Sequence, residues 1–220
     1  MDFSILKTQH TGRFLSVPRI AKDDLGGLRM CGRFFIEEED TEEELLAILQ
    51  ALNRRGAVCK TGEVLPTDTV AVVANSRSLQ PTPFAMQWGY TLPDGKKIIN
   101  ARSESASQRP MFMDGMRQRR CLVPASHYFE WSHDRQAKTK YAIRPQAAGT
   151  MYMAGLYRME AGRAVFTILT REAAPQIAFI HHRMPVILPG DAAEAWLRLQ
   201  TPAEEVLALA EGNVLYGAAI

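Results

Sequence analysis

The sequence predicts an α+β fold: a single domain built on a curved or barrel-like, mainly antiparallel β-sheet with a few flanking helices. Two observations favour this class. Short runs of β-branched and aromatic residues dominate the chain, and turns containing Pro, Ser or Gly separate these runs. With 220 residues, of which 46% are hydrophobic and 23% charged, the chain is also long enough to bury a core of its own.

One helix and several strands are expected in the first half of the chain. Thr41 and Glu44 form a capping box before an amphipathic run, and Gly56 follows that run, so a helix is expected between them. A strand is expected at Cys31, and Pro110 opens a short helical stretch that finishes with arginines. The other strands expected in this half are 69–73, 84–88 and 97–99.

The second half of the chain is expected to consist mainly of strands, followed by two helices. The strands are expected at 121–125, 128–131, 139–144, 150–157, 164–171 and 186–188. Asp191 and Glu194 are expected to cap a helix that runs through Leu199. Pro202 then starts another helix that runs through Leu209.

The charge of the chain is concentrated at its start. Residues 1–29 show no clear hydrophobic period and are expected to be a leader or an unused upstream start, outside a domain that spans 30–220. They hold five Lys and Arg against three Asp and Glu, which accounts for the net charge of +2. From residue 30 onward the two counts are 21 and 21, so any attraction to nucleic acid must come from local placement of arginines.

Several classes of protein are disfavoured by composition. No apolar run approaches the ~20 residues that span a bilayer, and residues 1–29 lack the features of a secretory signal, so a cytoplasmic protein without membrane contact is expected. The cysteines at positions 31, 59 and 121 are widely spaced and form no C-x-x-C pair. A disulfide framework or a zinc site is therefore not expected, and no metal or cofactor is predicted.

Cys31 is the most unusual residue of the sequence. It follows Met30, and a chain that began at Cys31 would carry a free α-amine, with a reference pKa of ~8, beside a thiol with one of ~8.5. Such a pair can form an imine with an aldehyde and then close onto the sulfur as a thiazolidine. The alternative is that Cys31 is a small buried residue at the start of a strand.

Three further polar residues stand at strand ends or in apolar surroundings. Asn100 lies in a polar cluster that ends a strand. Glu130 lies between two aromatic residues, so it is either exposed, hydrogen-bonded, or buried with a raised pKa that suits general acid or base chemistry. His181 is either a structural residue or a proton carrier at neutral pH.

Six ordered motifs resemble those of the SRAP family, the SOS response-associated peptidases or abasic-site processing proteins. They are 30–34 (MCGRF), 99–104 (INARSE), 110–112 (PMF), 119–125 (RRCLVPA), 128–131 (YFEW) and 181–185 (HHRMP), and the resemblance runs from residue 30 to about residue 188. The segment 62–67 follows the turn of the family only loosely, which leaves Pro66 uncertain as a DNA contact.

The resemblance implies an enzyme of the DNA-damage (SOS) response with crosslinking, peptidase and lyase-type activity. Cys31, exposed as the N-terminus, is implied to capture the ring-opened aldehyde of an abasic site in single-stranded DNA as a thiazolidine. Asn100 is implied to orient the α-amine or the sugar hydroxyls. Glu130 is implied to move protons during imine formation, and His181 to act as acid or base on the deoxyribose.

The resemblance also implies a set of DNA contacts. Phosphate contacts are implied for Arg33, Arg102 and Arg183, because a guanidinium suits a pair of phosphate oxygens. Base-stacking or wedge positions are implied for Trp88 and Phe112. The partner implied is single-stranded DNA that contains abasic sites, bound by a monomer associated with the nucleoid during DNA damage.

Other interpretations remain open from the residues themselves. Cys31 activated by His181 could serve a thiol peptidase that removes its own leader, and the arginines and aromatic residues could bind single-stranded or modified DNA without covalent chemistry. Trp88 could belong to the core. Glu104 could simply pair with Arg102, and the arginines at 117, 119 and 120 could form a solvated helix end.

Overall fold

The computed structural model describes residues 32–38, 42–132 and 138–219. Its larger sheet contains β3 (Thr69–Asn75), β4 (Pro81–Trp88), β7 (Asn100–Arg102), β8 (Arg120–Ala125), β11 (Met151–Glu160), β12 (Arg163–Glu172), β13 (Arg183–Pro185) and β14 (Ile187–Leu188). Its smaller sheet contains β1 (Arg33–Ile36), β2 (Gly62–Val64), β9 (His127–Trp131), β10 (Lys140–Pro145) and β15 (Val214–Ala218). A separate hairpin joins β5 (Tyr90–Thr91) to β6 (Lys97–Ile98).

The larger sheet closes on itself through β12. This strand pairs with β4 on one side and with β11 on the other, so the order β12-β4-β3-β8-β11 returns to its start as a small barrel. The pairings of β12 with β4 and with β7 are parallel, and the remaining pairings are antiparallel. The predicted α+β fold with a barrel-like, mainly antiparallel sheet is therefore confirmed.

Alternation along the barrel strands fills two separate cores. In β3, Val70 and Val72 belong to the core cluster that contains Trp88, whereas Ala71 and Val73 belong to the cluster that contains Trp196. Successive side chains of a strand point to opposite faces, so such a strand is buried on both sides and reads as a continuous apolar run. These strands were predictable for the same reason.

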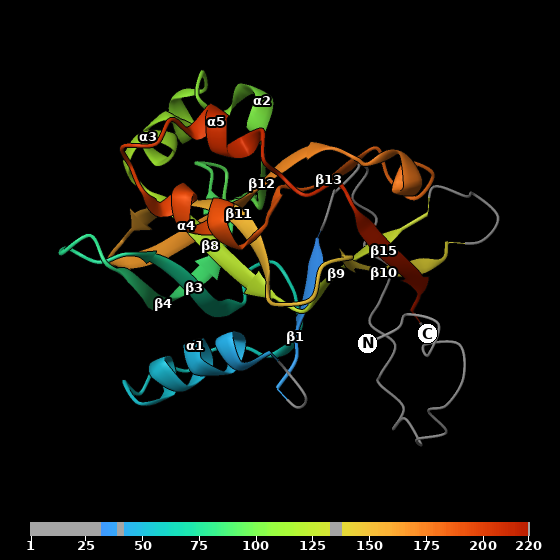
Figure 1. The fold of residues 1–220 in the computed structure, drawn as a ribbon. Helices are drawn as coiled ribbons and strands as arrows, with labels where there is room; N and C mark the ends of the chain where they lie inside the picture. The colour runs from blue at the N-terminus through green and yellow to red at the C-terminus, as the bar shows by residue number, and fades with distance from the viewer. Residues whose placement is uncertain (1–31, 39–41, 133–137, 220) are drawn as a thin grey trace.

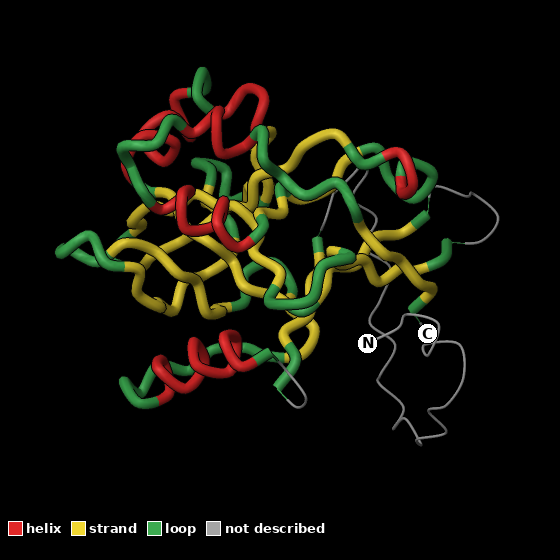
Figure 2. Tube along the Cα trace, in the orientation of Figure 1, coloured by secondary structure: helices red, strands yellow, loops and turns green. Residues whose placement is uncertain are grey.

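Helices flank the sheets on two sides (Figures 1 and 2). The helices are α1 (Glu43–Asn53), α2 (Ser103–Ala106), α3 (Pro110–Gln118), α4 (Gly190–Leu197) and α5 (Ala203–Leu207), and η2 (Pro175–Ile177) is a 3₁₀ turn. Figure 1 shows α1 along one side of the barrel and α2 to α5 on the other. None of the helices among the described residues is long and apolar enough to span a bilayer.

The predicted helices are present, but the structure does not show the two predicted side-chain caps. Helix α1 has Glu42 at its N-cap position without a side-chain cap, and Thr41 lies outside the described residues. Helix α4 begins at Gly190 after Pro189, so the prediction that Asp191 caps it is wrong. Asp191 lies in the first turn instead, where its charge complements the helix dipole.

The smaller sheet packs against the open side of the barrel. In β1, Phe34 is fully buried and its ring lies 5.1 Å from that of Trp88, which in turn stacks on Phe166 at 6.3 Å. Strand β15 at the edge of this sheet was not predicted, because its segment alternates buried and exposed residues over only five positions. The contact between the sheets brings the start of β1 to the end of the barrel where β7 begins.

Candidate functional site

Asn100 and Arg102 lie on β7, which pairs with β12. Strand β7 runs parallel to β12, with Asn100 opposite Ile168 and Arg102 opposite Thr170. The indole Nε1 of Trp88 donates a hydrogen bond to the carbonyl oxygen of Ile99 at 3.0 Å, which fixes the residue before Asn100. The Arg102 side chain is exposed at the point where α2 begins.

His181 is 4% exposed, and its ring is held by the backbone of Arg183. The backbone N–H of Arg183 donates to His181 Nδ1 at 3.0 Å, and Nδ1 also lies 3.2 Å from the carbonyl oxygen of Arg183. The ring stacks on that of His182, with centroids 4.4 Å apart. These contacts fix the position of the His181 ring through Nδ1.

Arg183 joins the His181 segment to the end of β7. Its guanidinium forms two parallel hydrogen bonds with the Glu104 carboxylate, at 2.6 and 2.8 Å, and Nη2 also donates to the carbonyl oxygen of Thr170 at 2.7 Å. The Arg183 side chain is 10% exposed, and its Nε is buried with no acceptor within the described part of the chain. The hydrogen bond from Arg183 lowers the pKa of Glu104.

The partner of Glu104 corrects one interpretation of the sequence. Glu104 pairs with Arg183 and not with its near neighbour Arg102. The strand pairing explains the difference. At Thr170, β12 pairs with Arg102 of β7 on one side and with Pro185 of β13 on the other. The start of β13, which carries Arg183, therefore lies close to α2, which follows β7 and carries Glu104.

Glu130 is buried, with 5% of its surface exposed. Its Oε1 accepts a hydrogen bond from the backbone N–H of Trp131 at 3.3 Å, and the side chain has further interactions within the protein. The exposed alternative for Glu130 is therefore excluded. Tyr141 of β10 lies directly opposite Glu130 in the antiparallel ladder, so the two side chains share one face of the smaller sheet.

Arg33 projects to the other face of the smaller sheet. It lies directly opposite Phe129 in the β1–β9 ladder, and Phe129 and Glu130 alternate across the sheet. The Arg33 guanidinium lies 5.2 Å from the centroid of the Trp131 ring. The register therefore separates Arg33 from the face that carries Glu130.

Glu63 neutralises two cations on that second face. Its Oε1 accepts hydrogen bonds from Arg33 at 2.9 Å and from Lys140 at 3.0 Å. Partial burial acts to raise the pKa of Glu63, but the hydrogen bonds and charges of the two cations outweigh it and the pKa is lowered. Lys140 also lies 3.8 Å above the ring of Phe129. A phosphate that binds Arg33 has to compete with Glu63.

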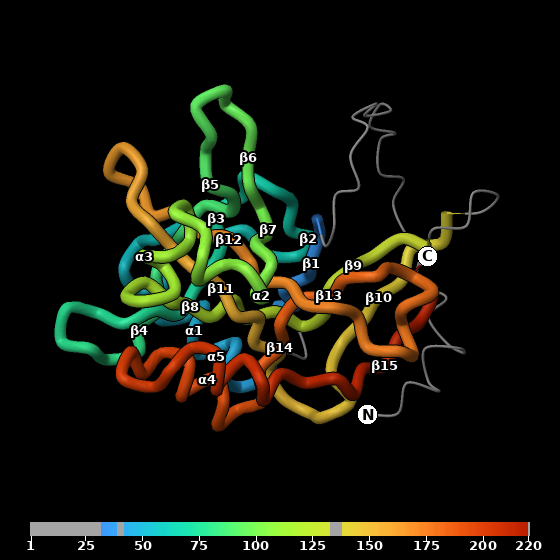
Figure 3. Tube along the Cα trace, turned by 90° about the horizontal axis from the view of Figure 1, so that it is seen from above, coloured from blue at the N-terminus to red at the C-terminus, as the bar shows by residue number. Residues whose placement is uncertain are grey.

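Cys31 lies outside the described residues, but its neighbour Gly32 is described. A Cβ atom added at Gly32 would lie 4.0 Å from Ile99 Cδ1. The residue that follows Cys31 in the chain is therefore close to the residue that precedes Asn100. Figure 3 shows β1 and β7 together in the centre of the molecule.

An aromatic contact links β10, which pairs with the Glu130 strand, to the His181 segment. The ring of Tyr141, opposite Glu130, lies 5.8 Å from the ring of Phe179, two residues before His181. The structure thus gathers the neighbours of Asn100, Glu130 and His181 along the seam between the two sheets. Neither Tyr141 nor Phe179 was predicted from the sequence, although the position of Phe179 two residues before a candidate histidine was a usable signal.

The two predicted base-stacking residues lie in the core instead. Trp88 is 0% exposed, between Phe34 and Phe166, so stacking on a base conflicts with its burial and its assignment is corrected to the core. Phe112 is 8% exposed and packs at 6.1 Å from Tyr90, so its assignment as a stacking residue is corrected likewise. Large aromatic residues contribute chiefly by burial, which explains both positions without a ligand.

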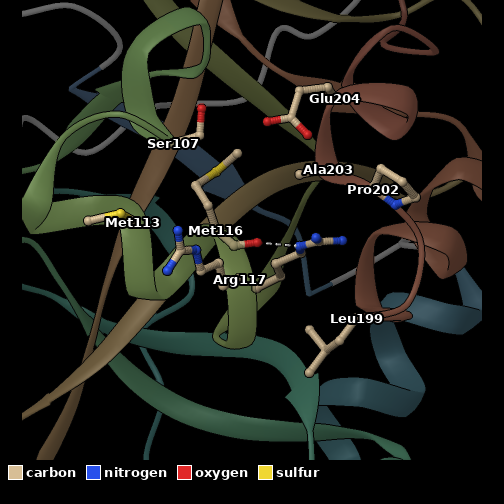
Figure 4. Close-up of a pocket in the computed structure, with 9 residues that line it drawn as sticks. Ser107, Met113, Met116, Arg117, Leu199, Pro202, Ala203 and Glu204 are labelled. Atoms are coloured by element: carbon tan, nitrogen blue, oxygen red, sulfur yellow. Dashed lines mark hydrogen bonds between the residues drawn. The ribbon is translucent and has the colours of Figure 1, made fainter.

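A pocket between α3 and α5 lies apart from these residues (Figure 4). Its volume is about 400 Å³, and its lining residues are Ser107, Met113, Met116, Arg117, Arg120, Leu199, Pro202, Ala203 and Glu204. Arg120 is 5% exposed and donates to the carbonyl oxygens of Met116 and Thr201, so the interpretation of Arg120 as part of a solvated helix end is wrong. Among the described residues no three His, Cys, Asp or Glu side chains could hold a metal ion together.

The chain belongs to the SRAP family. The family model described as SOS response associated peptidase (SRAP) matches residues 30–215. The relatives include the abasic site processing protein YoqW of Bacillus subtilis (strain 168), which is 30% identical over 182 residues, 76% of this chain and 80% of that protein. The abasic site processing protein YedK of Escherichia coli (strain K12) is 27% identical over 191 residues, 82% of this chain and 85% of that protein.

A solved structure shares the fold. A protein from Bacteroides thetaiotaomicron superposes with a TM-score of 0.72 at 20% identity, covering 86% of this chain and 92% of that one. At this identity the likeness concerns the fold, which is the same small barrel and adjoining sheet.

Proposed function

We propose that this chain processes abasic sites in single-stranded DNA by forming a covalent crosslink through Cys31. The observation that carries the proposal is the family match over residues 30–215, with relatives named as abasic site processing proteins. The clustering of the Asn100 and His181 segments about β12 supports it, because those segments carry the polar groups that the reaction needs.

The proposed reaction joins one aldehyde to two nucleophiles. The α-amine of Cys31 adds to C1′ of the ring-opened sugar, and the adduct loses water to give an imine. The thiol then adds to the imine carbon, and its proton passes to the nitrogen, which closes a thiazolidine. One water molecule leaves in total, and no oxidant or cofactor is required.

His181 and Glu130 divide the proton transfers. His181, whose Nδ1 is held by the backbone of Arg183, donates a proton from Nε2 to the ring oxygen of the deoxyribose and so promotes the opening that exposes the aldehyde. Glu130, buried on β9, accepts and returns protons at the amine and the departing water. Asn100 orients the α-amine or the sugar hydroxyls from the first residue of β7.

Arginines hold the phosphates on both sides of the lesion. Arg102 is exposed and has no ion pair within the described residues, so it is ready to bind. Arg33 and Arg183 are paired with Glu63 and Glu104, and phosphate oxygens replace these carboxylates when DNA binds. The requirement for a free α-amine on Cys31 means that residues 1–30 are absent from the active form.

A crosslinking assay tests the proposal. The protein is incubated with a single-stranded oligonucleotide that carries one aldehydic abasic site, and adducts are counted on a denaturing gel. We expect a stable adduct with the wild type and none with Cys31→Ala, while His181→Gln slows adduct formation on closed-ring sites by about 100-fold. Cys31→Ser lacks the thiol that closes the ring, so an equally stable adduct with this variant would contradict the thiazolidine.

A further inference from the structure

Three aromatic rings form an exposed cluster at the end of the molecule that carries β10 and β15. Phe179 is 54% exposed and Tyr216 is 42% exposed. Their ring centroids lie 5.4 Å apart at 68°, and both contact the partly buried Tyr141, at 5.8 and 6.0 Å. Figure 1 shows β10, β15 and the segment before β13 side by side at this end.

The exposure of Phe179 is not a requirement of the fold. The core contacts of its segment come from Ile177 and Ile180, which are 2% and 0% exposed. Phe179 lies between these two anchors and points away from the core, at a position where a polar residue would serve as well. On β15, Tyr216 lies opposite Ile143, which is 1% exposed and belongs to the core.

The cluster is continuous with the candidate functional site. Tyr141 is the cross-strand neighbour of Glu130 on the same face of the smaller sheet. Phe179 precedes His181 by two residues and Arg183 by four. A strand that places its reacting sugar between Glu130 and His181 would therefore run past these rings.

We propose that Tyr141, Phe179 and Tyr216 form a stacking platform for a nucleobase next to the abasic site in single-stranded DNA. The inference rests on the proposed function. An abasic nucleotide has no base of its own, so any base contact that holds the strand must come from the neighbouring nucleotides. Aromatic faces suit this task because every base has a π-face, and such a contact accepts any sequence. The rings pack edge to face, and Phe179 and Tyr216 remain 54% and 42% exposed, so part of their surface is available to a base.

A base-deletion cycle tests the platform without using the covalent reaction. The protein expressed from its own gene is titrated, by fluorescence anisotropy, against an oligonucleotide with one tetrahydrofuran residue, which mimics the abasic sugar but cannot open to an aldehyde. A second oligonucleotide carries tetrahydrofuran at both neighbouring positions as well. We expect the Phe179→Ala/Tyr216→Ala double variant to lose about tenfold in affinity for the first oligonucleotide and less than about twofold for the second.

Matched variants separate stacking from other causes. Phe179→Trp should retain affinity, because it restores a ring face. Met159→Ala removes a side chain of similar exposure, 56%, from the β11–β12 hairpin at the far end of the molecule, and should leave binding unchanged. Thermal unfolding of each variant checks that the fold is retained.

Two results would overturn the platform. The first is a double variant that binds both oligonucleotides as the wild type does, or that loses the same factor on both. The second is a change of oligomeric state in size-exclusion chromatography, which would assign the surface to a second copy of the chain. Adduct formation on an aldehydic site tests the proposed function separately. If the adduct forms but the double variant shows no base-dependent loss of affinity, only the platform is contradicted. If the base-dependent loss of affinity is seen but no adduct forms, only the crosslink is contradicted.

Discussion

Arg183 and Glu104 form a bidentate ion pair, with N–O distances of 2.6 and 2.8 Å, at the place where the His181 segment meets the end of β7. A carboxylate in this geometry occupies the same donors that a phosphate would use. The backbone of the same arginine contacts His181 Nδ1 and so holds the position of the ring. Glu104 thus supports the segment that carries the histidine, and under the proposed function it competes with DNA phosphates for Arg183.

The first prediction concerns this competition. Glu104→Gln removes the negative charge, so Arg183 becomes available to phosphate and affinity for a single-stranded oligonucleotide should rise by about threefold to tenfold at low salt. Anisotropy titrations at several salt concentrations measure it. Glu194→Gln, which removes an exposed carboxylate from α4, is the control and should have no effect. Weaker binding by Glu104→Gln would mean that Glu104 is needed only to hold Arg183 in place.

The second prediction concerns Arg102. Its side chain is exposed beside the proposed site, so Arg102→Gln should weaken binding to all sequences alike and reduce the salt slope by about 0.7, the value for one phosphate contact in a single strand. Arg163→Gln, an exposed arginine at the tip of the β11–β12 hairpin, should leave the slope unchanged. Equal slopes for both variants would remove Arg102 from the interface.

The third prediction concerns Trp88. Its ring is fully buried and its indole donates to Ile99, so Trp88→Phe should lower the free energy of unfolding by about 2–4 kcal/mol. Affinity for single-stranded DNA, measured well below the midpoint of thermal unfolding, should stay within about twofold of the wild type. Trp131→Phe is the partly exposed comparison and should cost less than about 1 kcal/mol. A large loss of affinity with little loss of stability in Trp88→Phe would restore its role as a stacking residue.

The fourth prediction concerns pH. Burial, with the charges of Lys140 and Arg144, lowers the pKa of His127 to about 4. In the unfolded chain the pKa is ~6.5, so the unfolded state binds a proton first and stability falls as the pH drops from ~6.5 to ~4. At about 1.4 kcal/mol per pKa unit, the loss is about 3 kcal/mol. His127→Phe keeps the stacking on Phe35 and removes the titration, so urea unfolding at pH 7.5 and 4.5 should differ less for this variant.

The barrel was predictable because its strands are buried on both faces and read as apolar runs bounded by turns. Strand β13 has only three residues, and the edge strand β15 is short and partly exposed, so their local patterns carried too little signal. Arg120 was misjudged for a related reason. Its position after a helix suggested solvent, whereas hydrogen bonds to residue 116 of α3 and to residue 201 in the loop before α5 hold it inside.

The site illustrates the difference between a motif and its geometry. Motif 181–185 placed the histidine and the arginine, but the partner of Arg183 is 79 positions away and follows from the position of β12 between β7 and β13. Phe112 lies in the matching motif 110–112 and yet belongs to the core, because a position in a motif does not say which face of an element meets solvent. Conversely, the platform of Tyr141, Phe179 and Tyr216 assembles from three distant segments.

Intact mass spectrometry of the protein expressed from its own gene tests the central claim most directly. The protein is weighed before and after incubation with a single-stranded oligonucleotide that carries one aldehydic abasic site. We predict a mass that begins at Cys31 and, after incubation, a denaturation-resistant species equal to protein plus oligonucleotide minus one water. A mass that begins at Met1, with no adduct, would contradict the crosslink and leave non-covalent DNA binding as the function of this chain.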